Sequence, residues 1–543
     1  MYDATARPPL PQNEPVLTYA PDTTERARLK ETLARMSGET IEIPLFIGGK
    51  EVTTGNLHLV RPPHRRDLLL ARCHEGGEKE ATEAVEAALA AWPAWSNTPF
   101  ADRAAVFLKA AELLATKYRA TLNAATMLGQ SKTAHQAEID AACELIDFFR
   151  FNVEFARRIQ AEQPTSGGGT WNIQEPRPLE GFVFAVTPFN FTAIAGNLPA
   201  APALMGNTVV WKPAQAAAFS AHFIMRLLVE AGLPDGVINM VQGSGPVIAE
   251  VVTSRRELAG IHFTGSTDVF RSLWTTVGDR VATYKNFPRL VGETGGKDFV
   301  FLHPSADLDT AAVAIVRGAF EYQGQKCSAA SRVYVPASLS ASLKERVVAL
   351  IGDIRVGDVA DFRNFMGAVI DDRAFQRIGS YLALARTDGS CSVLAGGGAS
   401  DKTGYFVEPT FVETRDPEHR LMCEEIFGPV LTAWTYPDRE YDRALELCDT
   451  TTPYGLTGAF FARDRAAIAH AATRLRHAAG NFYVNDKPTG AVVGAQPFGG
   501  ARGSGTNDKA GSMFNLLRWV SPRVIKENFA PPTELSYPFM KAE

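Results

Sequence analysis

The fold of this chain is decided by residues 181–214, which read GFVFAVTPFNFTAIAGNLPAAPALMGNTVVWKPA. Apolar runs over 181–186 and 207–211 predict two buried strands, and the alanine-rich run over 193–205 predicts a helix between them. Strand, helix and strand at such short intervals indicate a parallel sheet with crossover helices. The alternation continues through expected helices over 219–231 and 246–252 and expected strands over 236–241 and 258–263.

The residues that follow each strand are the first candidates for a binding site, because ligands on parallel sheets bind at the carboxyl ends of the strands. Ser266 stands between an expected strand and an expected helix, where backbone amides and a hydroxyl suit a phosphate. The dinucleotide fingerprint GxGxxG is absent. The strand-end segments are Thr187-Pro188-Phe189-Asn190, Lys212-Pro213-Ala214, Gln242-Gly243-Ser244-Gly245 and Thr264-Gly265-Ser266.

A second alternation of strands and helices, over 299–436, predicts a second α/β domain that contains Cys327. Cys327 follows an expected helix over 308–322 and stands next to Lys326, whose charge favours a thiolate. The alternative is a structural cysteine, because cysteine is among the most buried residue types. Glu293 stands between glycines at the expected start of this domain, either as an acid that other groups approach closely or as the solvated side chain of a turn.

The remaining segments extend these two domains. Residues 1–40 are rich in proline and charge and predict a surface extension with one helix over 23–36. The polar segment 170–180 is either a protruding hairpin between domains or a disordered loop, and the tail over 518–525 predicts a strand with no partner in its own neighbourhood. A hairpin is expected over 46–50 and helices over 80–91, 101–129 and 137–160.

The composition excludes several classes of function. The 543 residues are 45% hydrophobic and 21% charged with a net charge of −5, which gives no basic face for nucleic acid. No apolar run approaches the ~20 residues of a membrane span, and the N-terminal residues lack the apolar core of a secretory signal. The six cysteines are scattered, without a CxxC pair or zinc-like spacing, which predicts free thiols in a reducing cytoplasm and no metal site.

From Ile47 to the C-terminus the chain resembles the aldehyde dehydrogenase superfamily, because seven short motifs occur in the order typical of that family. Each motif alone is a modest signal, and together they favour Cys327 as a nucleophile over a structural cysteine. The resemblance implies an α/β fold with a Rossmann-type NAD-binding domain, an α/β catalytic domain and a small β element for oligomerisation. The motifs are Pro188-Phe189-Asn190-Phe191, Lys212-Pro213-Ala214, Phe263-Thr264-Gly265-Ser266, Glu293-Thr294-Gly295-Gly296-Lys297, Gly324-Gln325-Lys326-Cys327, Glu424-Glu425-Ile426-Phe427-Gly428-Pro429 and Pro497-Phe498-Gly499-Gly500.

Three stretches narrow the resemblance: QKCSA at 325–329, GAVVG at 490–494 and QPFGGARGSGTN at 496–507. They are similar to the branch of the family that oxidises L-glutamate γ-semialdehyde, the open form of Δ1-pyrroline-5-carboxylate, to L-glutamate in the second step of proline catabolism. The chain resembles the single-function form, because it is too short to include a proline dehydrogenase domain. The resemblance implies NAD as the cofactor.

The resemblance also implies roles for single residues. Cys327 is the expected nucleophile, which passes through a thiohemiacetal and a thioester. Asn190 and the Cys327 backbone N–H are the expected donors to the oxyanion, and Glu293 is the expected base for hydrolysis. The expected cofactor contacts are Pro188, Phe189, Lys212, Gly243, Ser266, Glu425 and Phe427. The expected substrate contacts are Phe191, Lys326, Ser328, Gly490, Ala491 and Phe498, with Ser328 and the amides of Gly490 and Ala491 on the carboxylate.

Cofactor choice and assembly follow from the same resemblance. Gln215 stands where the family often has a Glu that holds the ribose hydroxyls, and a neutral Gln does not repel a 2′-phosphate, so NADP stays a weaker alternative. A homo-oligomer, a dimer or an assembly of dimers, is expected. The expected divisions are an extension over 1–40, an NAD-binding domain over 41–160 and 180–290, a catalytic domain over 291–495, and oligomerisation segments over 161–179 and 515–543.

Other functions stay open at this point. The alternatives are an aldehyde dehydrogenase for another short semialdehyde, a relative that passes the thioester to coenzyme A, and a non-catalytic binding protein. Relatives that use coenzyme A lack the usual base glutamate, so Glu293 counts against that alternative. The joint presence of Cys327, Asn190, Glu293 and Glu425 counts against a non-catalytic role.

Overall fold

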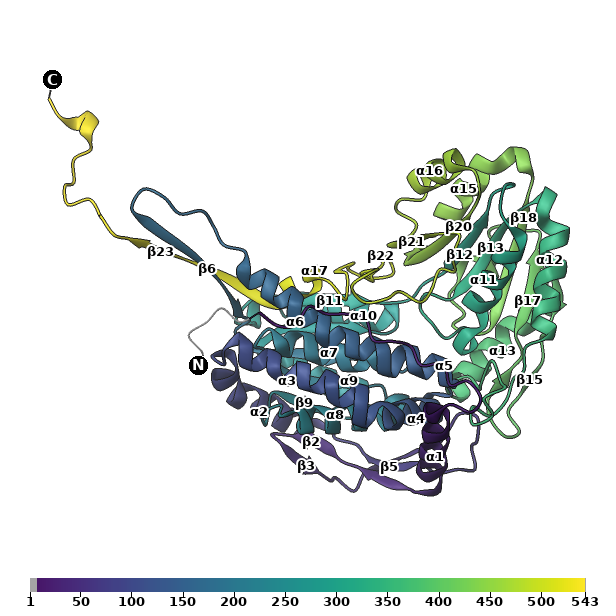
Figure 1. Cartoon of the computed structure of the whole chain (residues 1–543), viewed down its shortest axis with the longest axis horizontal. Coiled ribbons are helices and arrows are strands. Elements are labelled where there is room, and N and C mark those ends of the chain that lie inside the picture. The colour runs from purple at the N-terminus through teal and green to yellow at the C-terminus, as the bar shows by residue number, and fades with distance from the viewer. Residues whose placement is uncertain (1–6, 543) are drawn as a thin grey trace.

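The computed structural model describes residues 7–542, in which two α/β domains lie side by side (Figure 1). Residues 1–6 of the predicted N-terminal extension lie outside the described part. The first domain is built on a seven-stranded sheet, in which the five strands from β11 at one edge to β9 run parallel and the β2–β3 hairpin at the other edge runs antiparallel. In order across the sheet the strands are β11 (Arg289–Glu293), β10 (Leu258–Thr264), β7 (Phe182–Val186), β8 (Thr208–Lys212), β9 (Ile238–Met240), β2 (Leu45–Ile47) and β3 (Lys50–Val52).

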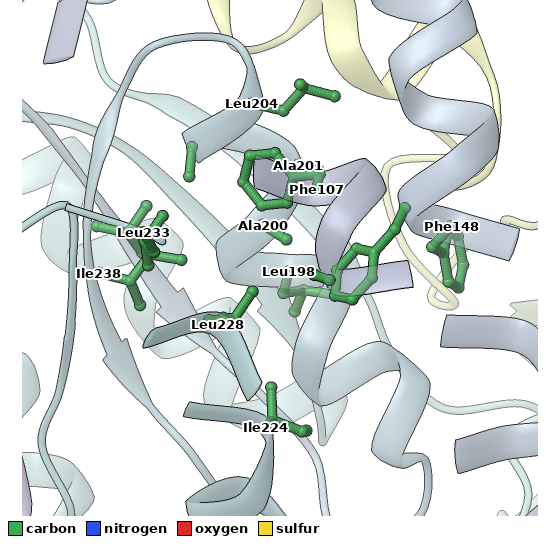
Figure 2. Close-up of a cluster of buried hydrophobic side chains, with 14 of the residues drawn as sticks. Phe107, Phe148, Leu198, Ala200, Ala201, Leu204, Ile224, Leu228, Leu233 and Ile238 are labelled. Carbon is green, nitrogen blue, oxygen red and sulfur yellow. The ribbon is translucent and has the colours of Figure 1, made fainter. Parts of the chain in front are cut away.

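Helices cover both faces of this sheet because its strands are apolar on both sides. Val183 and Val209 pack against one layer of helices, whereas Phe182 and Val210 pack against the other. Figure 2 shows part of the first layer, where Phe107, Leu198 and Leu228 belong to one buried cluster. The first layer contains α3 (Phe100–Leu113), α6 (Leu145–Ala161), α7 (Thr192–Leu204) and α8 (Ala218–Ala231), and the second contains α2 (Glu78–Ser96), α9 (Gly245–Ser254) and α10 (Thr267–Asp279).

The second domain repeats the same architecture. Its seven-stranded sheet is parallel except for the edge strand β14, and helices again lie on both faces. In order the strands are β14 (Cys391–Ala395), β17 (Thr410–Thr414), β18 (Val430–Tyr436), β13 (Ala330–Pro336), β12 (Asp298–Leu302), β20 (Thr457–Phe461) and β21 (Asn481–Val484). Its helices are α11 (Leu308–Phe320), α12 (Ala337–Gly352), α13 (Asp372–Thr387), α14 (Arg420–Cys423), α15 (Tyr441–Thr450) and α16 (Arg465–Arg474).

Smaller elements complete the two domains. The expected helix over 23–36 is α1 (Thr24–Gly38), which buries Leu29, Leu33 and Met36 against α4 (Arg119–Gln130) and a three-stranded sheet. That sheet consists of β1 (Ile41–Ile43), β5 (Ala71–His74) and β4 (Leu57–Val60). The helical layer also includes two π-helical turns, η1 (Leu114–Tyr118) and η2 (Glu138–Glu144), and two short helices, α5 (Ala134–Ala137) and α17 (Met513–Leu517). Two short strand pairs lie in loops: β15 (Ala399–Ser400) with β16 (Phe406–Val407), and β19 (Tyr454–Gly455) with β22 (Ala501–Arg502).

The polar segment 170–180 and the C-terminal tail are partners of each other. Strand β6 (Thr170–Pro178) pairs antiparallel along its whole length with β23 (Val520–Asn528). The pair forms an arm that projects away from both domains (Figure 1). The segment is therefore a strand, neither a disordered loop nor a hairpin closed on itself, and the tail finds its partner far away in sequence.

Two expectations around the catalytic candidates are corrected. Glu293 is the last residue of β11 at the edge of the first sheet, rather than part of a turn that opens the second domain. Strand β11 therefore spans the boundary predicted between residues 290 and 291. The helix expected to end at Tyr322 ends at Phe320, because the next turn reverses the backbone.

The start of α7 is fixed by a buried carboxylate. Asp140 in η2 accepts hydrogen bonds from the backbone N–H groups of Thr192 (2.9 Å) and Ala193 (2.8 Å), which are orphan donors at the helix N-terminus. Lys132 Nζ donates to the same carboxylate at 2.7 Å, and both side chains of the ion pair have no exposed surface. Asp140 therefore holds the segment that carries Asn190 and Phe191.

We expect Asp140→Ala to lower the free energy of unfolding by about 3–5 kcal/mol, because it leaves the Lys132 charge buried without a partner. The matched control is Glu83→Ala, which breaks an exposed helix pair with Lys79 (3.8 Å) and should change stability by less than about 0.5 kcal/mol. Urea unfolding followed by tryptophan fluorescence measures both. Similar losses in the two variants would contradict the role given to the buried pair.

Candidate active site

A left-handed stretch of backbone presents Cys327. Tyr322, Gln323 and Gly324 have φ values of 53°, 56° and 65°, so the chain turns sharply between α11 and β13. L-residues rarely adopt this conformation, and glycine does so without steric cost. A Cβ at Gly324 would also overlap the carbonyl group of Gly428, which explains the glycine here.

The Gln323 side chain holds this reversal in place. Its amide Nε2 donates to the carbonyl oxygens of Ser131 (3.0 Å) and Ala368 (2.8 Å), and its Oε1 accepts from Gly367 N–H (3.1 Å). Gln323 is buried, and all three partners are backbone groups. Because Ser131 follows α4 in the first domain, this side chain also ties the nucleophile's loop to that domain.

One cavity of about 350 Å³ brings Cys327 together with the predicted substrate contacts. None of these residues is adjacent to the cysteine in sequence except Lys326 and Ser328, so the fold has assembled them. Asn190 and Glu293 do not line this cavity. The predicted residues in its wall are Cys327, Phe191, Lys326, Ser328, Gly490, Ala491 and Phe498.

One end of the cavity offers hydrogen-bond donors. The Ser328 hydroxyl lies 2.8 Å from the hydroxyl of Thr489, a residue that the sequence reasoning missed. Among the described residues, the backbone N–H groups of Gly490 and Ala491 have no acceptor, whereas that of Val492 donates to Gln496 Oε1 (2.9 Å). Two free N–H groups beside a hydroxyl can bind an anion.

Lys326 has a different role from the one expected beside a thiolate. Its Nζ donates to Glu321 at 3.0 Å, and Lys487 Nζ lies 3.1 Å from the same carboxylate. Despite burial, the two lysines lower the pKa of Glu321 to about 2. Lys326 is thus a buried, paired charge in the cavity wall, and it is not a source of thiolate stabilisation.

Burial raises the pKa of the Cys327 thiol well above its ordinary value, and the charges of Asp298, Glu293 and Glu425 raise it further. The free protein therefore keeps this thiol protonated at neutral pH. Asn190 Nδ2 donates to the carbonyl oxygen of Gln325 at 3.1 Å, which leaves one of its two N–H groups free near the cysteine.

Glu293 lies close enough to Cys327 for its charge to act on the thiol. Its Oε2 accepts from the Gly500 N–H at 2.9 Å, which leaves Oε1 available. Burial raises the pKa of Glu293 well above its ordinary value, and the Gly500 hydrogen bond and Lys509 oppose that shift. A carboxyl group with a raised pKa can take a proton near neutral pH.

A second and larger cavity, of about 1390 Å³, opens at the carboxyl ends of the first sheet's strands and reaches the second domain. Phe189, Ser266 and Phe427 line it, and the rings of Phe189 and Phe427 meet edge to face at 5.8 Å. Ser266 caps α10, whose N-terminal amides face a region that suits a phosphate. The size of this cavity, its aromatic walls and the N-terminus of α10 fit a dinucleotide.

Pro188, Lys212 and Gly243 follow or end neighbouring strands of the first sheet, and Glu425 lies in the loop after α14 of the second domain; these four lie outside the lining of that cavity, whereas Gln215 lines it. Lys212 ends β8, where burial lowers its pKa and Glu75 opposes the shift. Gln215 Nε2 donates to the Glu75 carboxylate, so an acid stands beside the neutral Gln. Pro188 precedes Phe189 after β7, Gly243 approaches Gly76 so closely that a Cβ would overlap its carbonyl, and Glu425 Oε1 accepts from Gly296 N–H at 2.9 Å.

Several residues in the cavity wall around Cys327 carry no sequence signal. Glu144 lines the cavity from η2, and burial together with Asp140 raises its pKa well above the ordinary value. Asp147 and Asn13 also reach this wall. Asp147 lies in a helical stretch and Asn13 in a proline-rich extension, and an isolated polar residue in such a segment gives no indication of a functional role.

One Asp-Cys-His cluster lies on the surface of the second domain, away from both cavities. His419 Nε2 is 3.5 Å from Asp388 and 3.7 Å from Cys391 Sγ. His419 Nδ1 accepts the Leu421 backbone N–H at 3.1 Å, which places the ring proton of a neutral imidazole on Nε2. The nitrogen that faces the cluster is therefore a donor, as in a hydrogen-bonded group and unlike a metal ligand.

The comparisons with known proteins agree with this geometry. The model of the aldehyde dehydrogenase family matches residues 53–522. Mitochondrial Δ1-pyrroline-5-carboxylate dehydrogenases are 50% identical in Dictyostelium discoideum (99% of this chain, 97% of that protein) and 51% in Bos taurus (97% and 94%). The crystal structure of the Δ-pyrroline-5-carboxylate dehydrogenase from Mycobacterium tuberculosis bound with NAD has a TM-score of 0.96 at 52% identity, with 100% of both chains covered.

Within residues 7–542, no helix combines the length and the apolar character that a membrane crossing requires. Three findings indicate the same family. They are the match to the family model, the identity to relatives over nearly the whole chain and the fold shared with the solved structure. The chain belongs to the aldehyde dehydrogenase family.

Proposed function

We propose that the protein oxidises L-glutamate γ-semialdehyde, formed from Δ1-pyrroline-5-carboxylate, to L-glutamate with NAD. The observation that carries the proposal is the cavity that joins Cys327 to the Ser328 hydroxyl and the free N–H groups of Gly490 and Ala491. A thiol at one end suits an aldehyde, and an anion site at the other suits a carboxylate. The relatives that are 50% and 51% identical to this chain have Δ1-pyrroline-5-carboxylate in their names.

The reaction begins at Cys327. The thiol releases its proton to solvent, and the sulfur forms a bond to the aldehyde carbon, so that the carbonyl oxygen becomes an oxyanion. The free N–H of the Asn190 amide and the Cys327 backbone N–H are the donors that stabilise this charge, an effect worth about 3–4 kcal/mol per donor in such sites. A bound NAD would supply the hydride acceptor for the same carbon, whose loss of hydride would leave a thioester on Cys327.

Glu293 completes the reaction. Its free carboxylate oxygen takes a proton from water as the water attacks the thioester carbon, and Cys327 leaves as the thiolate. Glu293 then passes its proton to the thiolate, which restores the thiol, and the acid product loses its proton to solvent as the carboxylate. The Gly500 N–H holds the other oxygen of Glu293 and thus orients the base. The presence of this base favours hydrolysis over transfer to coenzyme A.

The carboxylate and the ammonium group of the substrate are bonded to the same carbon and contact different groups of the cavity wall. Its carboxylate binds Ser328 and the amides of Gly490 and Ala491, while Phe191 and Phe498 flank the aliphatic chain. The α-ammonium group needs an acid, and Glu144 lines the same cavity. A bound ammonium group would favour the ionised form of Glu144, whereas burial of the side chain disfavours that form.

The cofactor's place follows from the strand ends. Ser266 and the N-terminus of α10 would hold the pyrophosphate, Lys212 the adenosine ribose and Glu425 the nicotinamide ribose, and Phe189 and Phe427 would contact the nicotinamide end. The Glu75 carboxylate next to Gln215 opposes a 2′-phosphate, which favours NAD over NADP.

Copies of the chain associate through the arm formed by β6 and β23. Its exposed apolar side chains include Trp171 (51% exposed), Val524 (62%) and Phe529 (63%), on an element with little of its own domain beside it. This supports a dimer or an assembly of dimers. A cytoplasmic location stays a prediction, and the Dictyostelium and Bos relatives are named mitochondrial.

We expect the purified protein to reduce NAD when given Δ1-pyrroline-5-carboxylate, with a higher kcat/KM than for other semialdehydes and than with NADP. Cys327→Ala should abolish turnover, because no other group supplies the nucleophile, while NAD still binds. Steady-state kinetics across a panel of semialdehydes and both cofactors, with fluorescence titration of NAD, measures these quantities. Turnover retained in Cys327→Ala would refute the mechanism, and preference for another semialdehyde would refute the substrate.

The raised pKa of Cys327 predicts how its reactivity depends on pH. Below its pKa the thiol stays protonated, and the thiolate fraction rises about tenfold per pH unit. In the NAD-free protein, the rate of alkylation of Cys327 by iodoacetamide should therefore keep rising from pH 7 to about pH 9.5, whereas a free cysteine levels off above about pH 8.5. Mass spectrometry of the Cys327 peptide measures the rate, with N-acetylcysteine as the reference. A plateau below pH 8 would mean that the thiol is activated in the free protein.

The arm can be tested separately from catalysis. Val524→Asp with Ile525→Asp places charge on both faces of β23 and should shift the mass measured by sedimentation velocity toward that of a single chain. Val313→Asp, at an exposed valine on α11, is the matched control and should leave the mass unchanged. An unchanged assembly in the arm variant would place the contact elsewhere.

A further inference from the structure

The segment that precedes α1 forms part of the wall around Cys327. Residues 13–19, here called the latch segment, run in extended form over the helices of the first domain before α1 begins (Figure 1). Asn13, Glu14 and Val16 line the same 350 Å³ cavity as Cys327. An extension expected to lie on the surface thus lines the cavity that contains Cys327.

Asn13 connects two walls of that cavity. Its Nδ2 donates to Asp147 Oδ2 in α6 and to the carbonyl oxygen of Val493, both at 2.8 Å. The Glu14 backbone N–H donates to the other Asp147 oxygen at 2.7 Å. Among the described residues, the Val493 carbonyl has no other donor.

Val493 belongs to the loop that carries the anion site. Gly490 and Gly494 flank this loop with φ values of 91° and 82°, a conformation that favours glycine and leaves the backbone freedom to move. Inside the loop, Gln496 holds the Val492 N–H. Val493 and Gly494 pack on the first domain's helices through apolar contacts, and the hydrogen-bonded contact to those helices passes through Asn13. The direction of the Gly490 and Ala491 N–H groups therefore depends on this contact.

The rest of the latch segment is firmly anchored, so Asn13 is presented by a fixed backbone. The Glu14 carboxylate accepts from Arg119 (2.5 Å) and Arg150 (2.7 Å), and its side chain is only 11% exposed. Further along, the Leu17 N–H and the Tyr19 hydroxyl donate to Glu138 at 2.9 and 2.7 Å.

We infer that Asn13 is a positioning residue, which fastens the 490–494 loop so that its free N–H groups are aligned for the substrate carboxylate. The inference rests on the proposed function, because it assigns the loop to that carboxylate. Without Asn13 the loop must be ordered when the substrate binds, which costs affinity for a carboxylate-bearing aldehyde. The chemistry at Cys327 is unaffected, since Asn13 contacts neither the sulfur nor its oxyanion donors.

The experiment compares two Asn13 variants with a variant at the other end of the latch segment. Asn13→Ala and Asn13→Asp both remove the donor, and the second keeps the size. Tyr19→Phe removes an anchoring hydrogen bond that does not reach the loop. Full-length proteins with saturating NAD are assayed with Δ1-pyrroline-5-carboxylate and with butanal, an aldehyde that lacks the carboxylate, and thermal midpoints are recorded.

Both Asn13 variants should raise KM for Δ1-pyrroline-5-carboxylate roughly tenfold, the loss of about one hydrogen bond, with kcat within about twofold. The inhibition constant of the product L-glutamate should rise by the same factor, while butanal kinetics and the Tyr19→Phe variant stay at the wild-type values. Equal losses with both aldehydes, a loss shared by Tyr19→Phe, or an unchanged KM would each overturn the latch. Wild-type protein that oxidises butanal but not Δ1-pyrroline-5-carboxylate would instead overturn the proposed function.

Discussion

The left-handed backbone at Tyr322, Gln323 and Gly324 is the constraint on which the rest of the site depends. Each L-residue held in this conformation costs about 1–2 kcal/mol, so the turn persists only where its surroundings fix it. The buried Gln323 amide supplies that fixation by satisfying three backbone groups, one of them at Ser131 in the first domain. The Gln323 amide thus both holds the strained turn that presents Cys327 and joins the two domains. A shift of the cysteine would disturb the turn and the contact between the domains.

Charge is distributed around the cysteine in two separate zones. On one side, burial raises the pKa of Asp298 to about 8, and this acid together with Glu293 and Glu425 disfavours a thiolate. On the other side, two lysines share the single carboxylate of Glu321 within the wall, so one positive charge is not balanced by it. The resting protein therefore holds a protonated, weakly reactive thiol next to a site that still attracts an anion. Such a thiol is protected from oxidation until substrate and cofactor enter.

Much of the fold could be predicted from the sequence because its strands are buried on both faces. The apolar runs at 181–186 and 207–211 became β7 and β8 with shifts of one residue, since nothing but a buried strand accommodates them. The predicted substrate contacts also gathered in one cavity, because the family's motifs record that juxtaposition. Glu293 was harder, because a five-residue edge strand between loops has no clear alternation.

Contacts between distant polar residues could not be predicted. Lys326 looked like a partner of the cysteine, but its counter-ion Glu321 lies one turn back, on a stretch that reverses direction. Asn13 meets Val493 across 480 residues of chain, and an isolated asparagine in a proline-rich segment has no periodicity to reveal it. Sequence patterns report local structure and burial, whereas these hydrogen bonds depend on the final arrangement of both domains.

The pairing of β6 with β23 has a consequence for the order in which the chain folds. Arg177 and Ser521 lie 344 residues apart in sequence, yet they are neighbours in this ladder, and the buried Trp519 packs on His262 just before it. During synthesis most of the first domain emerges long before β23. Its helical layer therefore lacks the packing of Trp519, and β6 lacks its partner strand, until the whole second domain has been made. Such non-local closure is slow, and it leaves an unpaired strand exposed to other chains on neighbouring ribosomes. The second domain, whose strands are contributed by one continuous stretch, can fold first and on its own schedule.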